Sequence, residues 1–154
     1  MPDITPGVAA PAVDLPADSG GRFRLADHAG QSVVLYFYPK ADTPGCTNEA
    51  KDFSEHIAAF RAAGAVIVGV SKDAVKKLDR FKAKYDLQVT LASDETDDVC
   101  ERYGVWVEKS MYGKTYMGIE RATFLIGPDG TVREVWRKVS VKGHAEAVLA
   151  SLGG

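Results

Sequence analysis

Two uninterrupted apolar runs, 33–38 and 65–70, limit what this chain can fold into more than any other feature of its sequence. Each is short and rich in β-branched or aromatic residues, which is typical of a strand buried on both faces of a sheet. Between them the segment 46–64 carries apolar residues at helical spacing and ends in a glycine, a common helix terminator. This order predicts two neighbouring parallel strands joined by a helix.

The rest of the chain continues this alternation. We expect further strands at 12–15, 22–25, 88–92, 122–126 and 131–136, and further helices after Ser71 or Asp73, from Ser93 to Gly104 and over 142–152. The strand pairs at the two ends are joined by turn-forming residues and predict hairpins. Residues 105–119 have no clean period, and we interpret them as a long, partly packed loop.

This pattern favours an α/β fold with a mixed central sheet, helices on both faces and an N-terminal β-hairpin. The thioredoxin-like layout satisfies it. No repeat, linker or low-complexity segment divides the chain, so we expect a single domain over residues 1–154.

Composition excludes several classes of function. A net charge of −2 over 154 residues gives no basic field for nucleic acid or an anionic membrane, and no apolar run approaches transmembrane length. The segment 1–7 lacks the basic and apolar regions of a signal peptide. Two cysteines indicate a reducing compartment, so we expect the cytoplasm. The three histidines show no ligand spacing, and we expect no metal and no cofactor.

Cys46 stands where the first buried strand gives way to a helix. The strand ends at Pro39, Thr43 suits the N-cap and Pro44 the first helical position. A thiol in the first turn faces unpaired backbone N–H groups and the positive end of the helix dipole, and both favour the thiolate. Because the thiolate is the reactive form, this placement points to chemistry.

An inert cysteine is the alternative, since an isolated thiol in such a domain is usually a small buried hydrophobe. Two observations favour a reactive one. Cys46 follows a strand at the carboxyl edge of the predicted sheet, where α/β proteins bind ligands. Its neighbours from Thr43 to Thr47 are small or polar and do not resemble core residues.

The segment Pro39-Lys40-Ala41-Asp42-Thr43-Pro44-Gly45-Cys46 resembles the Pro-x-x-x-Thr-x-x-Cys signature of peroxiredoxins. The fuller run 43–50, Thr-Pro-Gly-Cys-Thr-Asn-Glu-Ala, is similar to the peroxiredoxin Q (bacterioferritin comigratory protein) branch. Residues 7–15 and the arginine-bearing stretch 113–126 resemble the same family near its two ends. The resemblance therefore covers nearly the whole chain.

This resemblance implies a thiol-dependent peroxidase that reduces hydrogen peroxide and organic hydroperoxides. Cys46 would be the peroxidatic thiolate and would become a sulfenic acid. Thr43 would accept a hydrogen bond from the peroxide, and Arg121 would hold the thiolate and polarise the departing oxygen. Pro39 would shield the sulfur, and Glu49 would orient Arg121. Without the resemblance, Arg121 and Glu49 would be interpreted as ordinary surface charges, and Pro39 as a residue that simply ends a strand.

The chain departs from the branch in the residues that regenerate the thiol. Many members carry a resolving cysteine five residues after the peroxidatic one, or on the following helix, but these places hold Lys51 and the stretch 80–84, Arg-Phe-Lys-Ala-Lys. Cys100 is the other thiol, and its apolar neighbours favour an inert core position. We therefore expect a one-cysteine cycle in which an external thiol reduces the sulfenic acid, with Cys100 a weak resolving candidate.

Two other classes of function stay open, a thioredoxin-like disulfide exchanger and a non-enzymatic redox sensor. The exchanger would normally show Cys-x-x-Cys, whereas Thr47, Asn48 and Glu49 follow Cys46. For the peroxidase we expect thioredoxin, glutaredoxin or a small thiol as reductant. We expect a monomer, with a weak dimer as the alternative.

Overall fold

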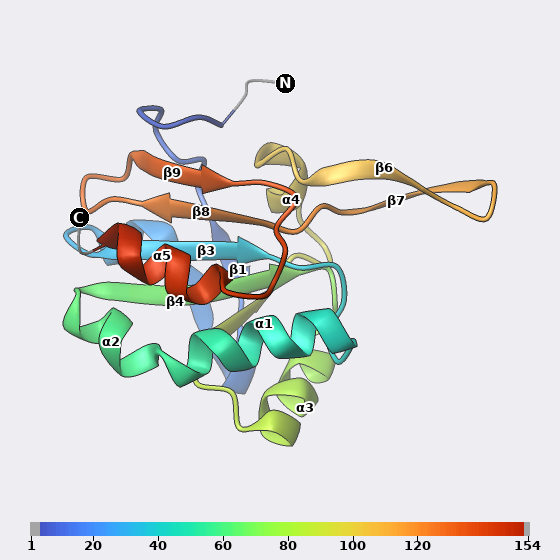
Figure 1. The fold of residues 1–154 in the computed structure, drawn as a ribbon, viewed down its shortest axis with the longest axis horizontal. Helices are drawn as coiled ribbons and strands as arrows, with labels where there is room; N and C mark the ends of the chain where they lie inside the picture. Colours follow the sequence, from blue (N-terminus) through green and yellow to red (C-terminus); the bar gives the residue numbers. More distant parts are fainter. Residues whose placement is uncertain (1–3, 153–154) are drawn as a thin grey trace.

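The computed structural model describes residues 4–152, so the first three residues of the segment inspected for a signal peptide, and the last two of the chain, lie outside it. A five-stranded sheet with the order β5-β4-β3-β8-β9 forms its centre (Figure 1). The sheet strands are β3 (Ser32–Phe37), β4 (Ala65–Ser71), β5 (Thr90–Ser93), β8 (Ala122–Ile126) and β9 (Val132–Trp136).

Strand β3 lies in the middle and confirms the predicted arrangement. It runs parallel to β4, with Ser32 opposite Ala65, and antiparallel to β8, with Phe37 opposite Ala122. Every residue of β3 after Ser32 is buried, which explains its continuous apolar sequence. The carboxyl end of β3 therefore meets the amino end of β8 at one edge of the sheet.

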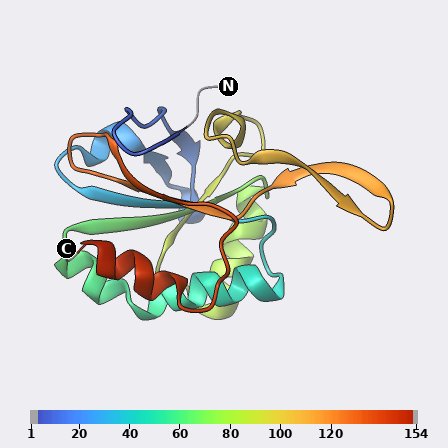
Figure 2. The ribbon, with the colours of Figure 1, turned by 45° about the horizontal axis from the view of Figure 1, so that its top comes forward.

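Two apolar cores cover the two faces of the sheet. Helices α1 (Pro44–Glu55), α2 (Ile57–Ala62), α3 (Val75–Tyr85) and α5 (His144–Leu152) lie on one face. The other face is covered by the N-terminal hairpin, β1 (Asp14–Pro16) with β2 (Arg22–Arg24), and by the short helix α4 (Val99–Arg102), as Figure 2 shows. Alternate residues of β3 supply the two cores: Val34 and Tyr36 face the long helices, and Leu35 and Phe37 face α4.

The expected loop at 105–119 is wrong. These residues form a two-stranded hairpin, β6 (Trp106–Met111) with β7 (Lys114–Ile119), which projects from the body of the molecule (Figure 1). Most of its side chains are exposed, so neither strand shows the apolar alternation that signals a half-buried strand. The turn that joins the strands is tight: Tyr112 and Gly113 both have positive φ, as a two-residue hairpin turn requires.

The expected helix from 46 to 64 is also interrupted. His56 ends α1 and precedes α2, so two helices take the place of one. The next helix, expected after Ser71 or Asp73, is α3; it begins after Ala74, and neither of those side chains caps it. Asp73 instead accepts hydrogen bonds from the Ala41 backbone N–H and the Ser71 hydroxyl, which ties the loop before α1 to the end of β4.

The helix expected to start at Ser93 is shorter in the structure, because α4 spans only Val99–Arg102. Asp94 does cap the amino end of α4, although a turn separates it from the helix. Its buried carboxylate accepts the backbone N–H groups of Val99 and Cys100. Within residues 4–152, no helix has the length and apolar character needed to cross a membrane.

Candidate active site

Cys46 lies in the first turn of α1, beyond the carboxyl end of β3. Its side chain is 2% exposed and packs in the core between the sheet and the long helices. Thr43, the residue before α1, is extended, and its carbonyl accepts the Thr47 N–H as the helix begins. The sulfur is thus held beside the amino end of a helix, where backbone N–H groups favour negative charge.

Thr43 stands at the N-cap position, but its side chain does not cap the helix. Its hydroxyl donates a 2.7 Å hydrogen bond to the Lys40 carbonyl. The hydroxyl hydrogen is therefore committed, and the lone pairs of Oγ1 remain able to accept a hydrogen bond.

Arg121 reaches Cys46 from a distant part of the chain. It directly precedes β8, and the antiparallel pairing of β8 with β3 brings it to the edge of the sheet where α1 begins. Its Nη2 lies 3.3 Å from Cys46 Sγ, and its Nη1 donates a 2.6 Å hydrogen bond to Glu49 Oε1. One planar guanidinium thus serves the sulfur and a carboxylate together, which a lysine ammonium would do with less defined geometry.

Gly45 favours this close approach. A Cβ atom at that position would lie 3.1 Å from Arg121 Nη2, closer than an ordinary van der Waals contact. The glycine therefore leaves the space that the guanidinium occupies beside the sulfur.

Glu49 is a buried carboxyl group, 1% exposed, about one helical turn beyond Cys46. Burial raises its pKa to about 7, although the positive charge of Arg121 favours ionisation. Its Oε2 has no hydrogen-bond partner among the described residues, which agrees with a strongly desolvated group. Burial disfavours the charged form of Arg121 as well, but Glu49 and Cys46 outweigh it and the pKa of Arg121 is raised.

Two tyrosines form the wall of the site on the β3 side. Tyr36 and Tyr38 are buried in the core that contains Cys46, and burial raises the pKa of both phenols. The Tyr36 ring stacks on Phe53 of α1 with 4.8 Å between ring centroids. It fits because Gly69 stands opposite it on β4, where a Cβ atom would lie 2.5 Å from the ring.

His144 and Thr123 form a buried polar pair on the same face of the sheet. Thr123 is paired with Tyr36 in the strand register, and its Oγ1 lies 2.7 Å from His144 Nε2. Burial, with a smaller contribution from the positive charge of Arg121, lowers the pKa of His144 to about 4. The imidazole is therefore neutral near pH 7.

The loop before α1 is fastened to α3. Asp42 has a positive φ of 62°, and its carboxylate accepts hydrogen bonds from the Tyr85 hydroxyl at 2.7 Å and Lys84 Nζ at 3.0 Å. Lys40 is exposed, but Asp42 holds this loop in place.

Pro39 is exposed at the end of β3. It lines a hollow of about 340 Å³ at the base of the β6–β7 hairpin, together with Lys40, Trp106 and Tyr116. Its expected shielding of the sulfur stays a prediction.

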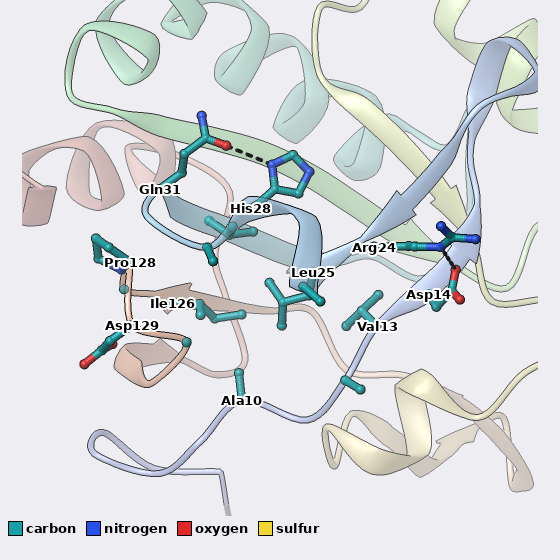
Figure 3. Close-up of a pocket in the computed structure, with 16 residues that line it drawn as sticks. Ala10, Val13, Asp14, Arg24, Leu25, His28, Gln31, Ile126, Pro128 and Asp129 are labelled. Carbon is teal, nitrogen blue, oxygen red and sulfur yellow. Dashed lines mark hydrogen bonds and ion pairs between the residues drawn. The ribbon is translucent and has the colours of Figure 1, made fainter.

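A separate cavity of about 580 Å³ lies at the other end of the sheet (Figure 3). Val33, at the start of β3, and the turn 127–130 line it, with Val13 and Leu25 from the N-terminal segment. Cys46 follows the opposite end of β3, so this cavity does not belong to the cysteine site.

Cys100 lies in the other core. It is fully buried on the α4 face of the sheet, whereas Cys46 is on the face of the long helices. Burial and the nearby Asp94 carboxylate raise the pKa of the Cys100 thiol. The five-stranded sheet separates the two sulfurs, and both cysteines are free.

The structure therefore brings Cys46, Arg121 and Glu49 into contact and places Thr43 at the start of the same helix. Sequence reasoning missed the spatial role of Gly45, the tether at Asp42 and the buried His144. Gly45 lies inside the recognised signature and could have been singled out. His144 offered no signal, because its neighbours come from separate parts of the chain.

Comparison with known proteins gives consistent matches over nearly the whole chain. The AhpC/TSA family model matches residues 6–135. The putative peroxiredoxin bcp of Coxiella burnetii is 50% identical, over 97% of this chain and 99% of its own. Peroxiredoxin Bcp of Escherichia coli is 44% identical, over 97% of this chain and 96% of its own.

Solved structures show the same fold. The bacterioferritin comigratory protein of Xanthomonas campestris, described for its alkyl peroxide reduction activity, superposes with a TM-score of 0.87 and 48% identity, covering 92% of this chain and 90% of that one. A peroxiredoxin Q of Xylella fastidiosa superposes with a TM-score of 0.93 and 38% identity, covering 99% and 98%. These neighbours share the thioredoxin-like architecture expected from the sequence.

Proposed function

This chain belongs to the AhpC/TSA family, in its peroxiredoxin Q (Bcp) branch, and is a thiol-dependent peroxidase; we propose that Cys46 is the thiolate that reduces the peroxide. One observation carries the proposal. The Arg121 guanidinium lies 3.3 Å from Cys46 Sγ while the amino end of α1 lies beside the same sulfur. Both stabilise a thiolate, and an inert cysteine would need neither.

In the first half of the cycle, the Cys46 thiolate attacks the terminal oxygen of a hydroperoxide. A sulfur–oxygen bond forms, the oxygen–oxygen bond breaks, and the departing oxygen takes a proton and leaves as water or an alcohol. Cys46 becomes a sulfenic acid. Hydrogen peroxide and organic hydroperoxides both fit this displacement.

Thr43 and Arg121 would each stabilise a different oxygen of the peroxide in the transition state of this step. Because the Thr43 hydroxyl hydrogen is bonded to the Lys40 carbonyl, Oγ1 can accept the hydrogen of the attacked oxygen. The Arg121 guanidinium, anchored on Glu49, would donate to the oxygen on which negative charge develops. Glu49 is then a positioning residue, and Pro39 would limit the access of water to the sulfur.

In the second half of the cycle, we propose that an external thiol reduces the sulfenic acid. Lys51 and Lys82 occupy the places where the branch often carries a resolving thiol, and Cys100 lies across the sheet from Cys46. Thioredoxin, glutaredoxin or a small thiol can supply the electrons.

Such a cycle needs a supply of reduced thiols, for which we propose a cytoplasmic location. We also propose that residues 1–154 act as one domain and that the protein works as a monomer. The weak dimer remains the alternative, to be tested by sedimentation velocity.

The decisive experiment compares Cys46→Ser with Cys100→Ala in peroxide consumption supported by dithiothreitol, thioredoxin and glutaredoxin in turn. We expect Cys46→Ser to abolish turnover and Cys100→Ala to keep most of it. Activity in the Cys46 variant would overturn the assignment. A single slow oxidation of the wild type without turnover would instead favour a redox sensor, and disulfide exchange without peroxide consumption would favour an exchanger.

A further inference from the structure

The exposed large apolar side chains of the described residues gather in one place. Met111, Tyr112, Tyr116 and Met117 all lie on the β6–β7 hairpin and are between 45% and 96% exposed. Single exposed apolar residues are common on protein surfaces, but a cluster that projects into solvent is typical of an interaction site. Figures 1 and 2 show that the hairpin stands away from the rest of the molecule.

The base of this hairpin adjoins the cysteine loop. Tyr116 and Met117 line the same hollow of about 340 Å³ as Pro39 and Lys40. Those last two residues begin the loop that leads from β3 into the helix of Cys46. A molecule that rests on the hairpin can therefore also reach the edge of the sheet where the sulfur lies.

One face of the hairpin combines apolar and positive side chains. The strand register pairs Lys109 with Tyr116 and Met111 with Lys114, so these four side chains share a face. Neither lysine forms a salt bridge with a carboxylate of residues 4–152, and neither does the nearby Lys40. A complementary partner would present an apolar patch with acidic side chains around it.

We propose that the β6–β7 hairpin is the docking surface for a protein dithiol reductant whose reactive thiol is surrounded by apolar and acidic side chains. The inference rests on the proposed function, because a one-cysteine peroxidase must receive a thiol from outside in every cycle. The hairpin consists of two six-residue strands and their turn, a small surface of the kind used in redox encounters that must form and separate quickly.

Docking leads to a defined exchange of electrons. The partner's thiolate attacks the Cys46 sulfenic acid, a disulfide forms between the two proteins, and the hydroxide that leaves takes a proton to become water. The partner's second thiol then attacks the partner's sulfur atom in this mixed disulfide. Cys46 departs as a thiolate, and the partner keeps the disulfide.

The test measures kcat/KM for thioredoxin, regenerated by its reductase and NADPH, against the turnover rate with dithiothreitol. Two variants address the hairpin, Met111→Ser/Tyr116→Ser for its apolar part and Lys109→Glu/Lys114→Glu for its charge. Arg61→Glu/Arg133→Glu is the matched control, since it changes the net charge equally at exposed residues of α2 and β9.

We expect each hairpin variant to lower kcat/KM for thioredoxin about tenfold or more, as the loss of central interface residues does. The effect of the lysine variant should shrink as salt is raised to about 0.5 M, because screening removes steering. Turnover with dithiothreitol should match the wild type, and the control should behave as the wild type throughout.

An unchanged kcat/KM for thioredoxin would overturn the docking site, as would an equal loss with dithiothreitol, which would mean that the hairpin acts on the catalytic site itself. Dimers that dissociate in the hairpin variants, with normal thioredoxin kinetics, would show that a second copy of this chain occupies the surface. A wild type that consumes no peroxide with dithiothreitol would refute the proposed function instead.

Discussion

Gly45 and Arg121 lie so close that a Cβ atom on residue 45 would stand 3.1 Å from Arg121 Nη2. The same nitrogen is 3.3 Å from Cys46 Sγ. The space left by one missing side chain therefore determines how near the guanidinium comes to the reactive sulfur. This relationship leads to a direct prediction.

Gly45→Ala should push the guanidinium away by a few tenths of an ångström without unfolding the protein. Because peroxide attack depends on donor position, we expect the rate of Cys46 oxidation to fall by roughly tenfold. Stopped-flow fluorescence during a single oxidation measures that rate. Gly21→Ala is the control, since Gly21 has a negative φ and an added Cβ makes only an ordinary contact there. An equal slowing in both variants would contradict this explanation.

After one equivalent of peroxide, the wild type should carry a sulfenic acid on Cys46 and no internal disulfide. Cys100 lies in the core on the opposite side of the sheet, and a disulfide requires the two Cα atoms to come within about 7 Å. Mass spectrometry with a sulfenic-acid trap should find the adduct on Cys46. A bond between Cys46 and Cys100 would show that Cys100 is a resolving thiol and that the core interpretation is wrong.

Glu49 and His144 should give the free energy of unfolding opposite dependences on pH. The folded pKa of Glu49, about 7, is above its ordinary value of 4.5, so its stabilising effect is lost as pH rises from 4.5 to 7. The folded pKa of His144, about 4, is below 6.5, so its contribution is lost as pH falls from 6.5 to 4. In the wild type the two slopes largely cancel.

Glu49→Gln should therefore leave a protein whose stability rises between pH 4 and 6.5, and His144→Gln one whose stability falls between pH 4.5 and 7. Each change is worth up to about 3 kcal/mol, because one pH unit of displacement corresponds to about 1.4 kcal/mol. Urea unfolding at several pH values measures it, with Glu55→Gln as an exposed control. Slopes identical to the wild type in both variants would contradict the assignment.

Asp42 should control how quickly the oxidised sulfur can be rescued. Since Cys46 is 2% exposed, the first turn of α1 must open before a thiol can reach it. A slow opening leaves the sulfenic acid exposed to a second peroxide and to conversion into sulfinic acid. Asp42→Asn weakens the tether to Lys84 and Tyr85 but tolerates the positive φ.

We therefore expect less sulfinic acid per turnover in Asp42→Asn than in the wild type at high peroxide and saturating reductant. Pro44→Gly, which loosens the start of the same helix, should act in the same direction. Mass spectrometry of Cys46 follows the modification, and Asp27→Asn is the exposed control. Equal sulfinylation in all four proteins would mean that helix opening does not limit rescue.

The sequence alone determined the features that depend on local pattern. The buried strands at 33–38 and 65–70 are continuous apolar runs, and Pro44 with the small residues around Cys46 marked the start of α1. Hydrophobic periodicity failed to predict structure in segments whose side chains are mostly exposed. The β6–β7 hairpin is exposed and shows no alternation, so the interpretation of 105–119 as a loop was wrong.

Only the tertiary structure decided which distant groups meet at the sulfur and which do not. The antiparallel pairing of β3 with β8 brings Arg121 to Cys46 across 75 residues of sequence, and the five-stranded sheet keeps Cys100 on its other face. Such contacts arise from strand order and register, which connect segments with no local signal in common. The chemistry of Cys46 is thus suggested by its own helix, but its electrostatic environment is a property of the assembled sheet.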